Sequence, residues 1–123
     1  MEIEALFWLG TRTAKFDEMV AFTRDVLGLS TTMEEPGMAF FELPNGDQFE
    51  VFGPDHHGGG HPASGVAAAF KVADAAAARD ELEAAGVEVS ELRSLFGYSW
   101  AYFTAPDDNA YLILSGGPAE EPA

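Results

Sequence analysis

A hairpin turn followed by an apolar strand occurs twice in this chain, and this repeat constrains the fold more than any other feature. The first copy covers residues 44–52 (Pro-Asn-Gly-Asp-Gln-Phe-Glu-Val-Phe) and the second covers residues 106–114 (Pro-Asp-Asp-Asn-Ala-Tyr-Leu-Ile-Leu). An aromatic run precedes each copy, at residues 38–41 and 100–103. Proline followed by Asn, Gly or Asp between alternating runs is typical of hairpin turns. Each half of the chain is therefore predicted to end in two antiparallel strands.

The residues before each hairpin predict the same order of elements in both halves. Each half begins with an alternating strand, continues with a helix that a glycine ends, and adds one strand before the hairpin. The predicted elements, in chain order, are a strand at residues 3–12, a helix at 16–27 and strands at 29–34, 38–43 and 48–52, then a strand at 65–73, a helix at 75–85 and strands at 87–92, 98–104 and 110–115.

The two predicted helices carry end signals. Thr13 is expected to cap the start of the first helix, which Gly28 ends, and Asp74 and Gly86 are expected to do the same for the second. The inner face of the first helix is predicted from residues at helical spacing: Phe16, Met19, Val20, Thr23 and Leu27.

This order of elements indicates an α+β fold built from two βαβββ modules in tandem. We expect a single domain over residues 1–123, because a chain of this length can bury one core. Within it we predict a first module at residues 3–53, a linker loop at 54–64, a second module at 65–115 and a flexible acidic tail at 116–123.

The composition restricts the partners of this protein. Twenty-one acidic against six basic residues give a net charge of −15, which repels nucleic acids and anionic lipids and attracts cations. A heavily solvated surface suited to high salt would show the same acidity. No run approaches the ~18 apolar residues of a membrane span, and the acidic start of the chain has no secretory pattern. With no cysteine, disulfides and thiolate chemistry are excluded, and we expect a cytoplasmic protein.

Three short stretches carry a resemblance to a known family. They are residues 21–29 (Ala-Phe-Thr-Arg-Asp-Val-Leu-Gly-Leu), 84–89 (Ala-Ala-Gly-Val-Glu-Val) and 105–109 (Ala-Pro-Asp-Asp-Asn). With the paired βαβββ pattern over residues 3–115, they resemble the vicinal oxygen chelate superfamily, which includes glyoxalase I, extradiol dioxygenases and bleomycin-resistance proteins. The resemblance implies that each module curls its sheet into a half-barrel, that the cupped mixed sheets enclose a cavity, and that the protein is a homodimer.

The same resemblance implies four positions at which metal-using members place their ligands. In this chain those positions hold Trp8, Glu50, Ala67 and Leu112, so the two copies of the repeat differ by Glu50 against Leu112. Only Glu50 can ligate a cation, whereas divalent cations need three or four protein ligands. We therefore expect no metal and no other cofactor.

Three roles remain open for Glu50. It could form an ion pair with Arg12, which falls on the same face of the first strand. It could anchor a ligand in the cavity by charge or hydrogen bonding, or act as a general base if burial raises its pKa. A buried glutamate must be paired or protonated, because an unpaired buried charge is costly.

Aromatic side chains at alternating positions are expected to line the cavity beside Glu50. The faces that hold Phe41 and Phe103 match those that the family packs against its helices, which assigns the opposite faces to the cavity. Flat rings with polar tips suit planar or cationic ligands, although core filling of a shrunken cavity would use the same residues. The predicted ligand-binding residues are Trp8, Arg12, Met38, Phe40, Gln48, Glu50, Phe52, Tyr98, Trp100, Tyr102 and Leu112.

The segment between the modules is rich in histidine and glycine, with His56, His57 and His61 around three consecutive glycines. Such a tract could bind a metal. Because ordering the glycines would cost backbone entropy, we interpret it as a flexible linker.

The function that these observations favour is metal-independent binding of a small molecule that is cationic and aromatic. It is similar to the bleomycin-resistance type, which sequesters a drug without altering it. The alternative is an enzyme of the same superfamily, a lyase, isomerase or cyclase, that uses Glu50 as acid or base or has a displaced metal site. We expect binding rather than catalysis, and Glu50 as the catalytic residue if the protein is an enzyme.

Overall fold

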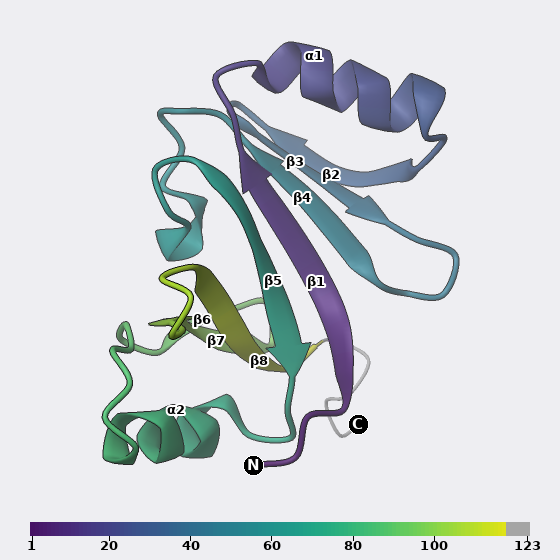
Figure 1. The fold of residues 1–123 in the computed structure, drawn as a ribbon. Helices are drawn as coiled ribbons and strands as arrows, with labels where there is room; N and C mark the ends of the chain where they lie inside the picture. The colour runs from purple at the N-terminus through teal and green to yellow at the C-terminus, as the bar shows by residue number, and fades with distance from the viewer. Residues whose placement is uncertain (118–123) are drawn as a thin grey trace. The chain divides into compact units, whose positions relative to one another are not determined.

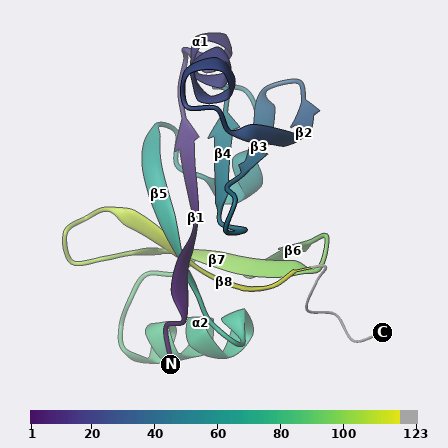
Figure 2. The ribbon, with the colours of Figure 1, turned by 90° about the vertical axis from the view of Figure 1, so that its right-hand side faces the viewer.

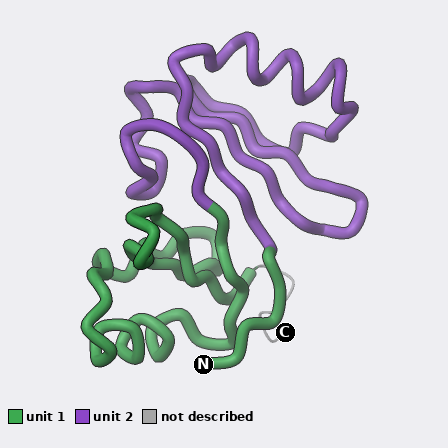
Figure 3. The backbone as a smooth tube through the Cα atoms, in the orientation of Figure 1, with its two compact units in different colours: residues 1–6, 68–123 green, residues 7–67 purple. Residues whose placement is uncertain are grey.

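The computed structural model describes residues 1–117, and these residues form two compact units (Figure 3). The N-terminal unit is Phe7–Ala67, and the C-terminal unit joins Met1–Leu6 to the chain from Ala68 onward. The backbone N–H of Glu4 donates to the carbonyl of Lys71 at 2.8 Å, which ties the start of the chain to the C-terminal unit.

The N-terminal unit contains a four-stranded sheet with a helix on one of its faces (Figure 1). The strand order is β2-β3-β4-β1; β1 and β4 run parallel, and the other neighbours run antiparallel. The elements are β1 (Ala5–Arg12), α1 (Phe16–Ala21), a π-helix (Phe22–Val26) that continues α1, β2 (Ser30–Glu35), β3 (Met38–Glu42), β4 (Gln48–Phe52) and a 3-10 turn (Gly58–Gly60).

Alternation along these strands sends one set of side chains toward α1 and the other set to the opposite face. Ala39, Phe41 and Val51 pack with Val20 of α1 in one apolar cluster. Phe41 and Val51 have no exposed surface. We call the face of each sheet that points away from its helix the distal face.

The C-terminal unit repeats this architecture with α2 against its sheet (Figure 2). The strand order is β5-β8-β7-β6, and β5 and β8 run parallel. The elements are β5 (Gly65–Lys71), α2 (Ala75–Ala84), β6 (Arg93–Leu95), β7 (Tyr98–Thr104) and β8 (Ala110–Gly116). Its helix-side core consists of Val72, Ala75, Ala78, Ala101 and Ile113. Neither helix of the described chain has the length and apolar character of a membrane span.

The α+β fold and its two βαβββ modules confirm the prediction from the repeat. The predicted strands at residues 48–52 and 98–104 match the observed bounds. Phe41 and Phe103 lie on the helix-side faces, as expected. The placement of the two sheets around a common cavity stays a prediction.

The end of the first helix differs from the prediction. Residues 22–26 form a π-helix, in which the N–H of Leu27 bonds to the carbonyl of Phe22, five residues back. The wider turn rotates Leu27 away from the inner face and leaves it 52% exposed. The assignment of Leu27 to the inner face was therefore wrong, whereas Val20 and Thr23 are buried as predicted.

The cap of the first helix is also different. Lys15 occupies the cap position without a side-chain hydrogen bond. The hydroxyl of Thr13 accepts from the N–H of Lys15 at 3.0 Å, so it closes the turn before the helix and does not cap it.

The strand predicted at residues 87–92 is wrong, because the strand forms at Arg93–Leu95 instead. Only one bridge, between Val89 and Phe103, remains in the predicted stretch. Ser90 explains the interruption, since its hydroxyl accepts from the N–H of Tyr102 at 2.9 Å where a strand would offer a carbonyl. Of the tail predicted at 116–123, Gly116 belongs to β8 and residues 118–123 lie outside the described residues.

Asp74 provides a stability test of the second helix, because its Oδ1 accepts from the N–H of Ala77 at 3.1 Å. We expect Asp74→Ala to lower the free energy of unfolding by about 1 kcal/mol, since it leaves a helix N–H without a partner. Asp74→Asn keeps the acceptor and should have little effect. Urea unfolding followed by circular dichroism measures both, with Asp80→Ala on the exposed face of α2 as the control. An equal loss in Asp74→Ala and Asp80→Ala would contradict the capping role.

Candidate functional site

The distal face of the N-terminal sheet brings together every ligand-binding residue predicted in the first module. Strand pairing sets these residues in rows across β1, β4 and β3. Glu50 occupies the middle row, between Gly10 and Phe40. The rows are Trp8, Gln48 and Glu42; Gly10, Glu50 and Phe40; and Arg12, Phe52 and Met38.

Among the residues that the structure describes, Glu50 has a single side-chain partner. The indole N–H of Trp8 donates to its Oε1 at 3.0 Å. Trp8 is 7% exposed, and its ring lies over Gly10, where a Cβ would collide with the indole. In the described chain, no Lys, Arg or His side chain forms an ion pair with Glu50.

The surroundings of Glu50 shift its titration. Burial raises the pKa of Glu50 from its ordinary value of 4.5 to about 7. The Trp8 hydrogen bond opposes this shift, and the negative charge of Glu35 adds to it. Near neutral pH the carboxyl can therefore accept a proton, release one or attract a cation.

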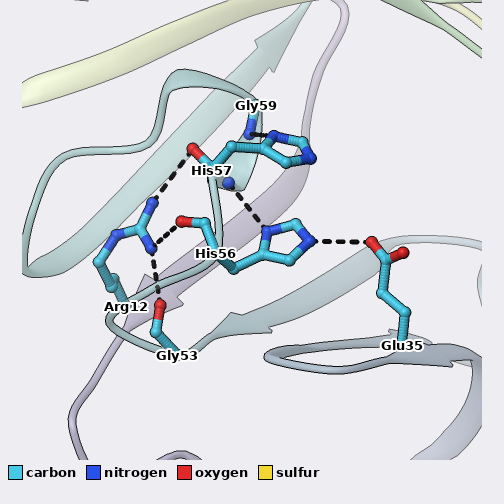
Figure 4. A network of polar contacts seen from close by, with 7 residues as sticks. Arg12, Glu35, Gly53, His56, His57 and Gly59 are labelled. Atoms are coloured by element: carbon cyan, nitrogen blue, oxygen red, sulfur yellow. Dashed lines mark hydrogen bonds and ion pairs between the residues drawn. The ribbon is translucent and has the colours of Figure 1, made fainter.

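Arg12 does not pair with Glu50, so that interpretation was wrong. Its guanidinium directs all five N–H groups at backbone carbonyls of the loop that follows β4. Figure 4 shows the contacts with Gly53, His56 and His57. The guanidinium also lies 5.6 Å from the centre of the Phe52 ring. The donors are Nε to Pro62 O (2.8 Å), Nη1 to Gly53 O (2.7 Å) and His56 O (2.5 Å), and Nη2 to His57 O and His61 O (3.3 Å each).

Residues 53–62, the His loop, pack over the Phe52 end of the distal face. The ring of His56 stacks on Phe52 with centroids 5.8 Å apart. The ring of His61 lies 5.2 Å from Phe52 and meets Trp8 edge-on at 6.0 Å. The Nε2 of His56 lies 2.8 Å from Oε1 of Glu35 (Figure 4). The loop is thus held in place by side chains, in contrast to the flexible linker expected for residues 54–64.

The tautomers of His56 and His57 count against metal binding by these rings. Nδ1 of His56 accepts from the N–H of Gly58 at 2.9 Å, and Nδ1 of His57 accepts from the N–H of Gly59 at 3.0 Å. A ring whose Nδ1 accepts carries its proton on Nε2, which leaves that atom no lone pair for a metal. In residues 1–117, no three His, Asp or Glu side chains are grouped as metal ligands.

His61 and Glu35 belong to this face but were not predicted there. Burial lowers the pKa of His61 and the charge of Arg12 adds to this effect, so the imidazole is neutral near pH 7. Glu35 pairs with Met38 because β2 has a register shift between Thr31 and Met33. A bulge of this kind breaks the alternation from which faces are predicted, and the sequence carries no signal for it.

The predicted residues of the second module share the distal face of the C-terminal sheet. Tyr102 pairs with Leu112 and both are buried, whereas Tyr98 and Trp100 are half-buried. Their assignment as ligand-binding residues remains a prediction.

Leu112 occupies the position in the C-terminal sheet that Glu50 occupies in the N-terminal one. Leu112 pairs with Ala69 of β5 and Tyr102 of β7. Glu50 makes the matching pairs, with residues of β1 and β3. The difference between the two copies of the repeat is therefore a carboxylate against an isobutyl group at equivalent places.

A cavity of about 300 Å³ opens on the helix side of the N-terminal unit, between α1 and the β2–β3 hairpin. Asp17, Arg24, Glu34 and Glu35 supply its charged lining. Met38 is the one predicted ligand-binding residue that lines it, so this cavity is not the predicted site around Glu50.

The four family ligand positions do not fit a divalent cation. Trp8 presents an N–H donor, which it uses on Glu50, and Ala67 and Leu112 have no side-chain donor atoms. Glu50 alone falls short of the three or four protein ligands that a stable site needs.

The chain belongs to the Glyoxalase/Bleomycin resistance protein/Dioxygenase superfamily, whose family model matches residues 5–112. The match spans both modules and confirms the resemblance found in the sequence. No curated protein matches the chain.

Solved structures with the same fold include enzymes and a member identified only by its superfamily. Methylmalonyl-CoA epimerase from Mycobacterium tuberculosis is 19% identical, covering 95% of this chain and 91% of its own, with a TM-score of 0.72. A Streptomyces coelicolor methylmalonyl-CoA epimerase (S115T) in complex with 2-nitronate-propionyl-CoA is 20% identical, covering 98% and 100%, with a TM-score of 0.69. A superfamily member from Vibrio splendidus 12B01 is 17% identical, covering 87% and 95%, with a TM-score of 0.65. At these identities the likeness establishes the fold alone.

The raised pKa of Glu50 makes a prediction about stability. The pKa of Glu50 is about 7 in the folded protein and ordinarily 4.5. Protonation of Glu50 therefore stabilises the folded state, and this stabilisation is complete below pH 4.5. The stabilisation is lost as the pH rises toward the pKa of Glu50 in the folded protein. The free energy of unfolding of Glu50→Gln, relative to wild type, should therefore increase between about pH 5.5 and about pH 8 by on the order of 1–2 kcal/mol.

Urea unfolding at the two pH values measures this difference. Glu42→Gln is the matched control, because Glu42 is an exposed carboxylate on the neighbouring strand. A Glu50→Gln difference that does not vary with pH would contradict the shifted titration.

Proposed function

We propose that this protein binds a small cationic, aromatic molecule without a metal, and that Glu50 anchors the ligand. The observation that carries this proposal is the isolation of Glu50, a carboxyl on the distal face whose one side-chain partner within residues 1–117 is a neutral indole N–H. A cation beside it would offset the desolvation that raises its pKa to about 7. A cationic ligand therefore gains free energy at this position that a neutral ligand does not.

The surroundings of Glu50 support an aromatic ligand. Phe40 lies beside Glu50 in the same row, and Trp8 and Phe52 lie in the rows on either side. Aromatic faces stabilise cations and flat rings, and the net charge of −15 draws cations toward the protein. In the finer form of the proposal the protein is a cytoplasmic homodimer that sequesters a drug, and residues Tyr98, Trp100, Tyr102 and Leu112 contribute to the site.

Matched probe pairs test the anchor. We expect 1-naphthylmethylammonium to bind at about pH 8 at least about tenfold more tightly than 1-naphthylmethanol, a difference of about 1.4 kcal/mol. Glu50→Gln should remove this preference, because the amide offers hydrogen bonds but no charge. Titrations followed by NMR or tryptophan fluorescence give both affinities.

A control variant distinguishes the effect of the Glu50 carboxylate from that of the net negative charge of the protein. Glu42→Gln removes the same unit of charge from a neighbouring strand and should keep the preference for the cation. Equal binding of the cationic and neutral probes to wild-type protein, or no saturable binding of either, would overturn the proposal.

A second candidate function is acid–base catalysis by Glu50. The pKa of about 7 favours it, because a carboxyl that titrates near neutral pH can both accept and return a proton. The solved epimerases give this candidate a concrete probe, methylmalonyl-CoA, which one of them holds in complex. That compound is polyanionic, and a chain with net charge −15 repels it.

We therefore expect no exchange of the α-proton of methylmalonyl-CoA with solvent deuterium in the presence of this protein, measured by proton NMR. Exchange that is present in the wild type and lost in Glu50→Gln would establish the catalytic function instead. Exchange that persists in Glu50→Gln would exclude Glu50 as the base.

A further inference from the structure

Arg12 uses its entire hydrogen-bonding capacity on the backbone of the His loop. A guanidinium has five N–H groups, and each donates to a different carbonyl between Gly53 and Pro62. The side chain is 7% exposed, so these bonds are shielded from water. Lysine has only three donors on one nitrogen and cannot reproduce this fan of contacts.

These bonds determine the position of a segment that would otherwise be mobile. Ordering a glycine-rich backbone costs conformational entropy, which the five charge-assisted hydrogen bonds offset. The contacts are spread along the loop, from Gly53 at its start to Pro62 at its end. The loop is therefore held along its whole length.

The clamped loop reaches the candidate site through His61. Its carbonyl accepts from Nη2 of Arg12, and its Nε2 lies 3.0 Å from the carbonyl of Gly65. With the backbone and the ring both held, the imidazole lies edge-on against Trp8 at 6.0 Å. Trp8 in turn donates its indole N–H to Glu50.

We infer that Arg12 is a positioning residue for Glu50: by clamping the His loop it holds His61 against Trp8, and so keeps the indole N–H of Trp8 on the Glu50 carboxylate. Arg12 acts through contacts with the loop and does not touch Glu50. The consequence for ligand affinity rests on the proposed function, but the positioning itself does not require a ligand.

The indole N–H groups provide a direct test in the ligand-free protein. The chain has two tryptophans, so an ¹⁵N-labelled sample gives two indole signals. We expect the solvent-exchange rate of the Trp8 indole N–H to rise about tenfold or more in Arg12→Met, the scale of one lost hydrogen bond. The backbone N–H of Ala78 in α2, which donates to the carbonyl of Asp74 at 3.0 Å, should not change its exchange rate and serves as the internal reference.

Two further variants keep the test decisive if Arg12→Met does not fold. His61→Ala removes the ring that touches Trp8 but leaves the carbonyl that Arg12 binds, and should also release the Trp8 indole. Arg12→Ala with added guanidinium chloride at low millimolar concentration should recover protection, because the free cation can occupy the carbonyl cage. Arg24→Met is the matched control, since Arg24 is an exposed arginine paired with Asp25.

The outcomes separate this inference from the proposed function. Unchanged Trp8 exchange in folded Arg12→Met and in His61→Ala would overturn the positioning role, whatever the protein binds. Increased exchange in both variants supports the role even if neither naphthyl probe binds the wild type. If a probe does bind, Arg12→Met should weaken it and Arg24→Met should not.

Discussion

A single buried guanidinium, that of Arg12, holds the segment on which the candidate site depends. A cation can be buried without a carboxylate when enough dipoles surround it, and here backbone carbonyls do so. The arrangement also determines the residue at position 58. Two constraints favour glycine at position 58. Its φ of +62° disfavours other residues, and a Cβ there would collide with Nη2 of Arg12. The order of the His loop thus originates in a side chain far from it in the sequence.

Arg12 and Glu50 carry opposite charges on the same sheet face but differ in how many hydrogen-bond partners they have. They lie in neighbouring rows of the same face, yet they do not meet, because carbonyls already occupy every donor of Arg12. Glu50 is left with one neutral N–H. The buried carboxyl of Glu50 therefore lacks the cationic partner that would offset its desolvation. At the equivalent place in the C-terminal unit, buried Leu112 needs no such partner.

The sequence was sufficient for the fold and for the faces of the sheets, because both follow from short-range rules. The turn residues of the two hairpins mark the strand ends, and alternation groups the residues within each strand. The resemblance to the family then predicts that Glu50, Phe40 and Trp8 share one face, as they do. The contacts of Arg12 could not be predicted, since its partners are main-chain oxygens and no residue type marks them. The π-helix after α1 and the register shift in β2 were not predicted either. Each changes the spacing at which side chains return to the same face, and the prediction assumes that this spacing is regular.

The contact between Trp8 and Gly10 has a consequence for how this sequence can change over evolutionary time. The indole occupies the space that any side chain at position 10 would need. A substitution at position 10 alone would displace the indole from Glu50, and a small residue at position 8 alone would leave a void above the glycine. The two sites are therefore expected to vary as a pair among relatives. A relative with a smaller side chain at position 8 could also carry a residue other than glycine at position 10.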